Sequence, residues 1–522
     1  MLRFTVHGSD DLVARTVESA WLFGPEEVPV PAEISVESGS NGVSVIRCEK
    51  HSAEPAGISL VPSPTDLPGV SSAVPLVLQT CLLQERERPY SMTLELARHR
   101  IMTFLNKLED WSLFDLETAH PAMEAFERAR QAFTSALVAL GGDAQERHAE
   151  TDTLAKEALT LSVLAGERLV EAELESRFPA RVRGETYQRA YRALPARPSG
   201  PPPLLKNPTG TGIVLPSKPF AAATVAASRF SDSEAQLVRG SSDFLSLPMR
   251  WTELEPDEGK YNFAPTDRWI EWAVRTAKMP VVAGPVVDFS AKGAPEWLHI
   301  WEHDYETLRE VVYEHVRSVV TRYRRTVPRW TIASGLHRND NFALTFEQMM
   351  DLTRMVVLLT RKLQPSAKVQ VEVVQPFSGD AGRSPRSLPG VIYADMAAQS
   401  GVAVDAYAVR LELAAPNPGS ITRDLMTLSA TVDRFAVLER PIVANIVTAT
   451  RFDRPGRAWL ARAMEIVAAK PWVYAVTCES LTPDARRLPA GLSATDGAPL
   501  DSIATLSGLR EGVRNTHRVD TA

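Results

Sequence analysis

Apolar and polar residues alternate in two different ways over the first part of the chain. Residues 1–85 contain short runs such as LRFTV, AEISVES and GVSVIRCE, whose period of two predicts strands separated by turns. Residues 91–192 instead repeat apolar positions at helical spacing, beginning with Leu94, Ala97 and Ile101. The first range is therefore predicted to be a small β-rich domain, and the second a helical hairpin or bundle.

The pattern changes again after residues 193–212, a Pro- and Gly-rich stretch that predicts a linker. Over residues 213–518, apolar runs alternate with helical segments. The candidate strands are FLSLPM, MPVVAGPVV, RWTIAS, KVQVEVV, DAYAVRLEL, RPIVANIV and WVYAVTC. The candidate helices are 265–278, 304–325, 345–363, 390–400, 421–437 and 457–469. This alternation predicts a multidomain α/β protein with a C-terminal (β/α)8 TIM barrel. An open doubly wound sheet stays as the alternative, although no Gly-rich phosphate loop follows a candidate strand.

Composition narrows the class of protein. A chain of 522 residues with 44% apolar and 23% charged residues is typical of a globular protein of two or three domains. The net charge is -7 and the basic residues are scattered, which argues against nucleic acid or a membrane surface as partner. Cys48, Cys81 and Cys478 are far apart, so neither a disulfide framework nor a metal site is expected. With no recognisable secretory or membrane-spanning segment, we expect a cytoplasmic protein.

Several motifs of the C-terminal half resemble glycoside hydrolase family 10, the β-1,4-xylanase family of (β/α)8 barrels. They are MRWTELEPDEGKYNF at residues 249–263, then APEWL, then LREVVYEHVRSVVTRYRRTVPRW with His315, and the closing LPAGLSATDGAPLDSIATLSGLR. The resemblance covers residues from about 230 to 515. It implies a barrel with an oligosaccharide groove and no cofactor.

The resemblance also implies a mechanism that this sequence does not support. The family uses two carboxylates about 5–5.5 Å apart, one as acid/base and one as nucleophile. Its acid lies at the end of a W-D-V-V-N-E pattern, where this chain has Ser334 followed by Gly335. Its nucleophile lies in a T-E-L-D pattern, where this chain has Asn445 followed by Ile446. Both glutamates are replaced, so the family's chemistry cannot run at these positions.

Other carboxylates follow predicted strands and could replace the lost pair. Glu412 and Glu479 are the first candidates and Asp288 is the reserve, whereas Glu372 in KVQVEVV is less favoured. Equally, each of these carboxylates could cap a helix, face solvent, or pair with an arginine such as Arg250 or Arg410.

Ligand contacts are expected from polar and aromatic side chains near the same strand ends. Trp297 and Trp301 lie on a predicted loop and could stack on sugar rings, whereas Trp251 and Trp330 are expected to pack within the barrel. The ligand-binding candidates are Arg250, Trp297, Trp301, Ser334, His337 and Asn445. His299 and His303 do not form an H-E-x-x-H motif, so no metal site is predicted.

Three hypotheses follow. The favoured one is a pseudo-hydrolase that keeps a barrel groove and binds a carbohydrate, or serves as a scaffold. The second is an active hydrolase of β-linked oligosaccharides with relocated carboxylates. The third is an assembly platform that contacts a protein partner through residues 1–200.

Overall fold

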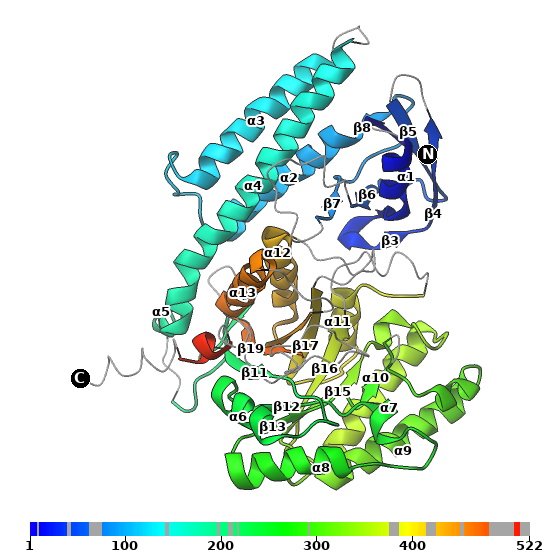
Figure 1. Ribbon diagram of the computed structural model, residues 1–522, viewed down its shortest axis with the longest axis vertical. Helices are drawn as coiled ribbons and strands as arrows, with labels where there is room; N and C mark the ends of the chain where they lie inside the picture. Colours follow the sequence, from blue (N-terminus) through cyan, green and yellow to red (C-terminus); the bar gives the residue numbers. More distant parts are fainter. Residues whose placement is uncertain are drawn as a thin grey trace. The chain divides into compact units, whose positions relative to one another are not determined.

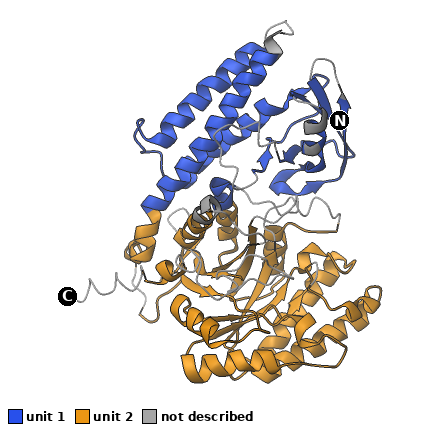
Figure 2. Ribbon diagram, in the orientation of Figure 1, with its two compact units in different colours: residues 1–176, 377–385, 416–430 blue, residues 177–376, 386–415, 431–522 orange. Residues whose placement is uncertain are grey.

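The computed structural model divides the chain into two compact units, which Figure 2 colours separately. Unit 1 comprises residues 1–176, 377–385 and 416–430, and unit 2 the remainder. The structure describes residues 1–7, 10–38, 43–61, 76–140, 146–195, 199–206, 212–216, 219–290, 293–374, 386–413, 424–448, 454–479 and 506–511. Part of the predicted linker and most of the closing motif lie outside these residues.

The N-terminal part of unit 1 is β-rich, as the period-two pattern predicts. Its strands form two four-stranded sheets, ordered β4-β5-β1-β8 and β3-β2-β6-β7. The strands are β1 (Leu2–His7), β2 (Trp21–Phe23), β3 (Pro29–Val30), β4 (Ala32–Ser38), β5 (Val43–Lys50), β6 (Gly57–Leu60), β7 (Leu78–Gln79) and β8 (Tyr90–Ser91). One side of β1 and β5 supplies Leu2, Phe4, Ile46 and Cys48 to the core. The sequence pattern does not predict the additional helix α1 (Asp10–Glu18).

The helical part of unit 1 agrees with the three predicted helices. They are α2 (Met92–Asp110), α3 (Pro121–Leu140) and α4 (Glu146–Val182), and the short α5 (Glu185–Arg192) follows in unit 2. Phe104 of α2 stacks on Phe126 of α3 with ring centroids 4.4 Å apart. A buried ion pair joins Arg100 of α2 to Asp424, with Arg100 Nη1 3.0 Å from Asp424 Oδ2. Segment 416–430 therefore contributes to unit 1 although it follows a barrel strand in the sequence.

Unit 2 contains eight parallel strands that close into a barrel. Their order is β11-β19-β18-β17-β16-β15-β13-β12, with β14 beside β15, and the bridge between Thr224 and Ser246 joins the first strand to the last. The strands are β11 (Phe220–Ala223), β12 (Leu245–Leu247), β13 (Val281–Ala283), β14 (Val287–Asp288), β15 (Arg329–Ser334), β16 (Lys368–Val374), β17 (Ala406–Leu413), β18 (Ile442–Thr448) and β19 (Val473–Cys478). A short separate ladder pairs β9 (Leu205–Lys206) with β10 (Ile213–Val214). The predicted barrel is confirmed, and the open-sheet alternative is wrong.

Helices cover the outside of the barrel strands, as Figure 1 shows. They are α6 (Asp232–Ser241), α7 (Trp251–Leu254), α8 (Ala264–Glu271), α9 (Tyr305–Tyr323), α10 (Phe346–Leu363), α11 (Gly390–Gln399) and α13 (Arg454–Ala469). A further helix, α12 (Leu425–Arg434), begins in unit 1 and ends in unit 2. Short single-turn segments are η3 (Trp272–Ala277), η4 (Glu296–Trp301), η5 (Leu336–Arg338) and η8 (Phe435–Leu438). In the described part of the chain, no helix is long and apolar enough to cross a bilayer.

Candidate functional site

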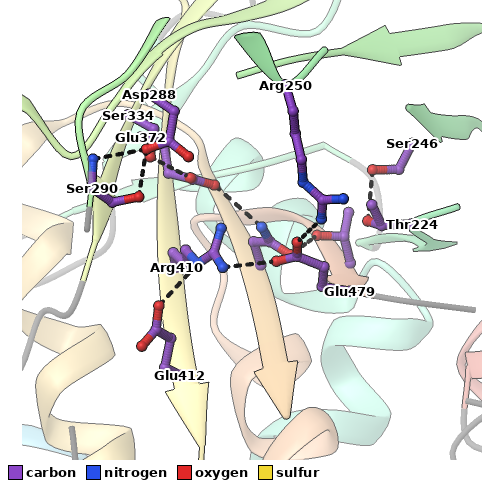
Figure 3. A network of polar contacts seen from close by, with 12 residues as sticks. Thr224, Ser246, Arg250, Asp288, Ser290, Ser334, Glu372, Arg410, Glu412 and Glu479 are labelled. Carbon is purple, nitrogen blue, oxygen red and sulfur yellow. Dashed lines mark hydrogen bonds and ion pairs between the residues drawn. The ribbon is translucent and has the colours of Figure 1, made fainter. Parts of the chain in front are cut away.

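Strands β14 to β19 bring polar side chains together at their carboxyl ends, and Figure 3 shows part of this group. In a parallel barrel these ends meet at one rim, where barrel active sites are built. The strand register aligns Ser334 of β15 with Glu372 of β16, and Arg410 of β17 with Asn445 of β18. The residues that gather there are Asp288, Ser334, Glu372, Arg410, Asn445, Thr477 and Glu479.

The carboxyl group of Glu372 lies at the centre of this group. Ser334 Oγ donates to Glu372 Oε1 at 2.7 Å, and Asn445 Nδ2 donates to Glu372 Oε2 at 3.2 Å. Thr477 Oγ1 donates to Asn445 Oδ1 at 3.0 Å and so orients the amide. Burial raises the pKa of Glu372 above its ordinary value, although Arg410 and the Ser334 hydroxyl act in the opposite direction. Glu372 therefore holds a proton more tightly than a solvated carboxyl group does.

Glu479 lies between two arginines. Its Oε1 is 2.9 Å from Arg250 Nη2, and its Oε2 is 3.2 Å from Arg410 Nη2. Glu412 does not approach Glu479 directly and instead pairs with Arg410, with Nε to Oε1 at 3.2 Å. Burial lowers the pKa of Arg410, but Glu479 and the other surrounding carboxylates outweigh it and raise that pKa above its ordinary value. Glu412 and Glu479 thus share an arginine, which is the ion-pair alternative that the sequence left open.

Asp288 is bound by its own loop. Its Oδ1 accepts hydrogen bonds from the backbone N–H of Ser290 at 2.9 Å and from Ser290 Oγ at 2.6 Å. The side chain is 9% exposed and lines the same cavity as Glu372 and Glu479. Its role as a reserve catalytic carboxylate stays a prediction.

The two positions that the resemblance assigns to the family's glutamates are both without a carboxylate. Gly335 has φ +69°, and a Cβ there would lie 2.6 Å from the backbone nitrogen of Ser290. A side chain at this position would therefore collide with main chain. Ile446 is fully buried and is not among the cavity residues, whereas the preceding Asn445 lines the cavity.

The cavity enclosed by the barrel has a volume of about 290 Å³. At its carboxyl-terminal end it is lined by Arg250, Asp288, Glu372, Arg410, Asn445, Thr477 and Glu479. Oppositely charged groups and an amide around an accessible space are typical of sites that orient a polar ligand. Among the described residues, no group of three or more His, Cys, Asp or Glu side chains is placed to hold a metal ion.

The predicted aromatic contacts have other partners. Trp297 is half-buried on η4, packs edge-on against Trp251 with centroids 6.0 Å apart, and donates from Nε1 to the carbonyl of Glu255 at 3.1 Å. Trp301 is also half-buried, and its Nε1 is buried without a hydrogen-bond partner. Trp251 and Trp330 are fully buried, so their predicted packing role is confirmed.

His337 occupies a buried position where both ring nitrogens bind main chain. Its Nδ1 lies 2.9 Å from the carbonyl of Leu388, and the N–H of Val374 donates to Nε2 at 3.0 Å. Burial lowers its pKa to about 4, so the ring is neutral near pH 7. The predicted ligand contact of His337 gains no support from this placement.

The sequence ranked Glu372 below Glu412 and Glu479 and did not select Arg410, Gln370 or Thr477 as site residues, although all of these except Glu412 line the cavity. A signal was available in KVQVEVV, because the period of two places Lys368, Gln370 and Glu372 on one face of β16. The valines of this segment indicate a buried apolar strand and so hide the polar pattern. In a barrel strand both faces are covered by protein, and here the polar face is the one that points into the barrel.

The fold is a (β/α)8 barrel with a polar carboxyl-terminal rim, and comparisons with known proteins identify similar chains. The model of glycosyl hydrolase family 10 matches residues 221–350, which span β11 to β15 and include Gly335. Endo-1,4-beta-xylanase B of Thermotoga neapolitana is 28% identical over 86 residues, which are 16% of this chain and 24% of that protein. The match thus spans about a quarter of the curated relative. The C-terminal unit is therefore a divergent barrel similar to glycosyl hydrolase family 10.

Solved structures of the same family are also similar. Xylanase 10B from Thermotoga maritima aligns with a TM-score of 0.43 and 16% identity, covering 57% of this chain and 95% of that one. Xylanase B from Clostridium stercorarium F9 aligns with a TM-score of 0.43 and 14% identity, covering 56% of this chain and 96% of that one.

Proposed function

We propose that the barrel binds a carbohydrate without the two-carboxylate hydrolysis of its relatives. The observation that carries this proposal is the backbone at Gly335, which excludes any side chain where the resemblance requires the catalytic acid. A damaged copy of an active enzyme would keep space for the missing glutamate. Here the loop around Ser290 occupies that space, so the replacement is built into the structure.

The ligand class follows from the chemistry of the cavity rim. Arg250, Asn445 and Glu479 present donors and acceptors that match the hydroxyl groups of a sugar, and Arg250 and Asn445 are partly accessible. A volume of about 290 Å³ lies at the low end of small-molecule pockets. We therefore favour a short saccharide, with one or two rings inside the rim, over a long polymer.

The test combines calorimetry with product analysis on the full chain, using xylo-, cello- and manno-oligosaccharides. We expect binding of at least one series and no release of shorter sugars. Arg250→Lys should weaken that binding by about tenfold, because lysine keeps the charge but loses the planar pair of donors. Arg268→Lys on the exposed side of α8 is the matched control and should bind as wild type does. Absence of binding to all three series would reject the carbohydrate proposal.

The relocated-carboxylate hypothesis is the second candidate, and one contrast favours it. Burial raises the pKa of Glu372, whereas Glu479 is paired with two guanidinium groups. Two carboxylates whose environments differ in this way are the usual arrangement for acid/base catalysis. Sugar release that disappears in both Glu372→Gln and Glu479→Gln, with folding retained, would establish this candidate in place of binding alone.

A further inference from the structure

The barrel cavity does not stop at the polar rim but continues along the lumen to the opposite end. Its lining includes Phe220, Pro280, Pro328 and Lys368, which lie at the amino-terminal ends of their strands. Pro280, Pro328 and Lys368 are exposed, so this end of the lumen is accessible to solvent. The lumen of a (β/α)8 barrel is normally filled by layers of bulky branched side chains. The part of the lumen at the amino-terminal ends of the strands, called the lower lumen below, is open in this barrel. This difference from the usual filled lumen needs an explanation.

Small residues leave the lumen empty. Ser246, Ala408 and Ala475 line the cavity from three different strands, and Gly284 lines it directly after β13, where barrels usually carry Val, Ile or Leu. Ser246 and Gly284 are only half-buried although they lie within the barrel wall. The free volume is thus built from residue choice on several strands rather than from one missing side chain.

The wall of the lower lumen is apolar and aromatic. Its residues form one cluster composed of Phe220, Ala222, Phe244, Val282, Ala408, Val443, Tyr474 and Ala475. The rings of Phe220 and Tyr474 lie 5.2 Å apart at 51°. Such a wall suits a flat apolar body better than a sugar that needs hydrogen bonds on all sides.

One buried hydrogen-bond acceptor, on Gln370, indicates that the inner end of a ligand must carry a hydrogen-bond donor. Gln370 is 2% exposed and lines the cavity, and its Nε2 donates to Thr331 Oγ1 at 2.7 Å. Its Oε1 is buried and has no hydrogen-bond partner among the residues that the structure describes. An unsatisfied buried acceptor is unfavourable, and a ligand hydroxyl or amine at this point would satisfy it.

A positively charged side chain, that of Arg329, lies at the amino-terminal opening of the lower lumen. The guanidinium of Arg329 lies 4.7 Å above the ring of Tyr474, and within the described ranges no carboxylate pairs with it. The nearby Asp243 is engaged elsewhere, since it accepts from the N–H of Ala221 at 3.0 Å and pairs with Arg510 at 3.2 Å. Lys368 adds a second positive charge at this amino-terminal opening, although it contacts Asp405 at 3.1 Å. The amino-terminal opening therefore favours a negatively charged ligand.

We propose that the lower lumen binds a small aromatic carboxylate that carries a hydrogen-bond donor at its far end. The carboxylate lies at Arg329, the ring packs against the Phe220–Tyr474 pair, and the donor reaches Gln370. Arg329 is the register partner of Lys368, and Gln370 is two residues further along β16. The two positions are therefore about 6–7 Å apart along the strand direction, so the cation and the acceptor lie at different depths of the lumen.

This site does not depend on the carbohydrate proposal, because it uses residues at the opposite end of the barrel from Arg250 and Glu479. The probes are 4-hydroxybenzoate, benzoate, which lacks the donor, and 4-hydroxybenzyl alcohol, which lacks the carboxylate. Calorimetry with the full chain should show 4-hydroxybenzoate binding most tightly and each of the other two more weakly. Oligosaccharide binding is measured in parallel, so failure of one proposal is distinguishable from failure of the other.

Variants assign the contacts. Gln370→Met should reduce 4-hydroxybenzoate affinity to that of benzoate and leave benzoate unchanged. Arg329→Gln should weaken both acids by about tenfold and leave the alcohol unchanged. Arg325→Gln, at an exposed arginine four residues earlier, is the matched control and should behave as wild type. Ala408→Leu fills the lumen and should abolish binding of all three probes, with the circular dichroism spectrum confirming the fold.

Three outcomes would overturn the proposal. The first is a dissociation constant weaker than about 1 mM for 4-hydroxybenzoate with the wild-type chain. The second is equal binding of the three probes. The third is undiminished binding by a folded Ala408→Leu variant, which would place the probe outside the lumen.

Discussion

The hydroxyl of Ser334 donates a 2.7 Å hydrogen bond to the carboxyl group of Glu372. The two residues occupy register partners at the ends of neighbouring strands β15 and β16. The position after Ser334 is the one where the resemblance requires the catalytic acid and the chain has glycine. A buried carboxyl group is therefore present at the rim, but it comes from the next strand and is bound by Ser334 and Asn445.

The raised pKa of Glu372 predicts how stability depends on pH. Because the folded state binds this proton more tightly than the unfolded chain, its favourable contribution is complete below the ordinary pKa of 4.5 and is lost as pH rises through the folded value. Glu372→Gln removes this dependence. Its unfolding free energy relative to wild type should therefore increase between about pH 4 and about pH 8, as measured by urea titration.

The control for this prediction is Glu258→Gln, at an exposed position in the turn after α7. Its unfolding free energy relative to wild type should stay constant over the same range. A Glu372→Gln variant whose relative stability is equally flat would mean that Glu372 titrates as a solvated carboxyl group does.

The second prediction concerns the loss of stability when Gly335 is substituted. Two separate constraints, its backbone conformation and the space around it, act on this residue. Its φ of +69° disfavours any other residue, and a Cβ would lie 2.6 Å from Ser290 N. Gly401 has a similar φ of +78° but open space around it. Gly401→Ala should destabilise by about 1 kcal/mol from backbone conformation alone. Gly335→Ala should destabilise by about 2–4 kcal/mol, since the collision adds to the same backbone term.

Urea titration of the two glycine variants separates these constraints. Equal losses would show that the loop at Ser290 moves freely out of the way. Gly335→Glu, which restores the residue type that the family uses, should show no hydrolysis of xylo-oligosaccharides. Gain of activity in that variant would contradict the view that the site has been rebuilt around glycine.

Arg410 is predicted to be essential for the stability of the rim. It contacts both Glu479 and Glu412, and its removal takes a guanidinium partner from the buried Glu479, which also pairs with Arg250. Arg410→Gln should reduce the unfolding free energy by about 3 kcal/mol, whereas breaking an exposed pair such as Arg275–Glu271 should change it by less than about 0.5 kcal/mol. Arg410→Gln/Glu479→Gln should lose less stability than the sum of the two single variants, because the buried carboxylate that lost a partner is gone. A double variant less stable than the sum of both singles would contradict this account.

The barrel itself was predictable because its strands and helices differ in period and length. KVQVEVV and DAYAVRLEL correspond to β16 and β17, and the predicted helices 345–363 and 390–400 correspond to α10 (Phe346–Leu363) and α11 (Gly390–Gln399). The first barrel strand, β11, was not predicted, since its sequence FAAA lacks the β-branched residues that identify strands. It forms a strand because β19 and β12 supply partners on both sides.

The candidate site was predictable only in part, because its geometry depends on partners from distant strands. The sequence indicated that Glu479 and Asp288 follow strands, and both line the cavity. It could not indicate that Arg410 joins Glu412 to Glu479, since the three residues lie on two strands that are not hydrogen-bonded to each other. The alternating pattern of β16 was the one local signal for Glu372, and hydrophobicity around it concealed that signal.

His337 carries the last prediction, which concerns acid stability. Its pKa is lowered by burial to about 4, so the folded state requires a neutral ring that accepts from the N–H of Val374 and contacts the carbonyl of Leu388. A lowered pKa contributes stability that is complete above the ordinary value of 6.5 and is lost as pH falls toward 4.

Wild type should therefore lose about 3 kcal/mol through this residue between about pH 6.5 and about pH 4, and His337→Gln should lose correspondingly less. Glutamine can supply one donor and one acceptor and does not titrate, which makes the comparison specific to the ring's charge. His99, whose pKa burial also lowers to about 4, is present in both proteins and cancels in the difference. An imidazole resonance of His337 that titrates near pH 6.5 in the folded chain would show that the ring is solvated, and would return it to the set of ligand-binding candidates.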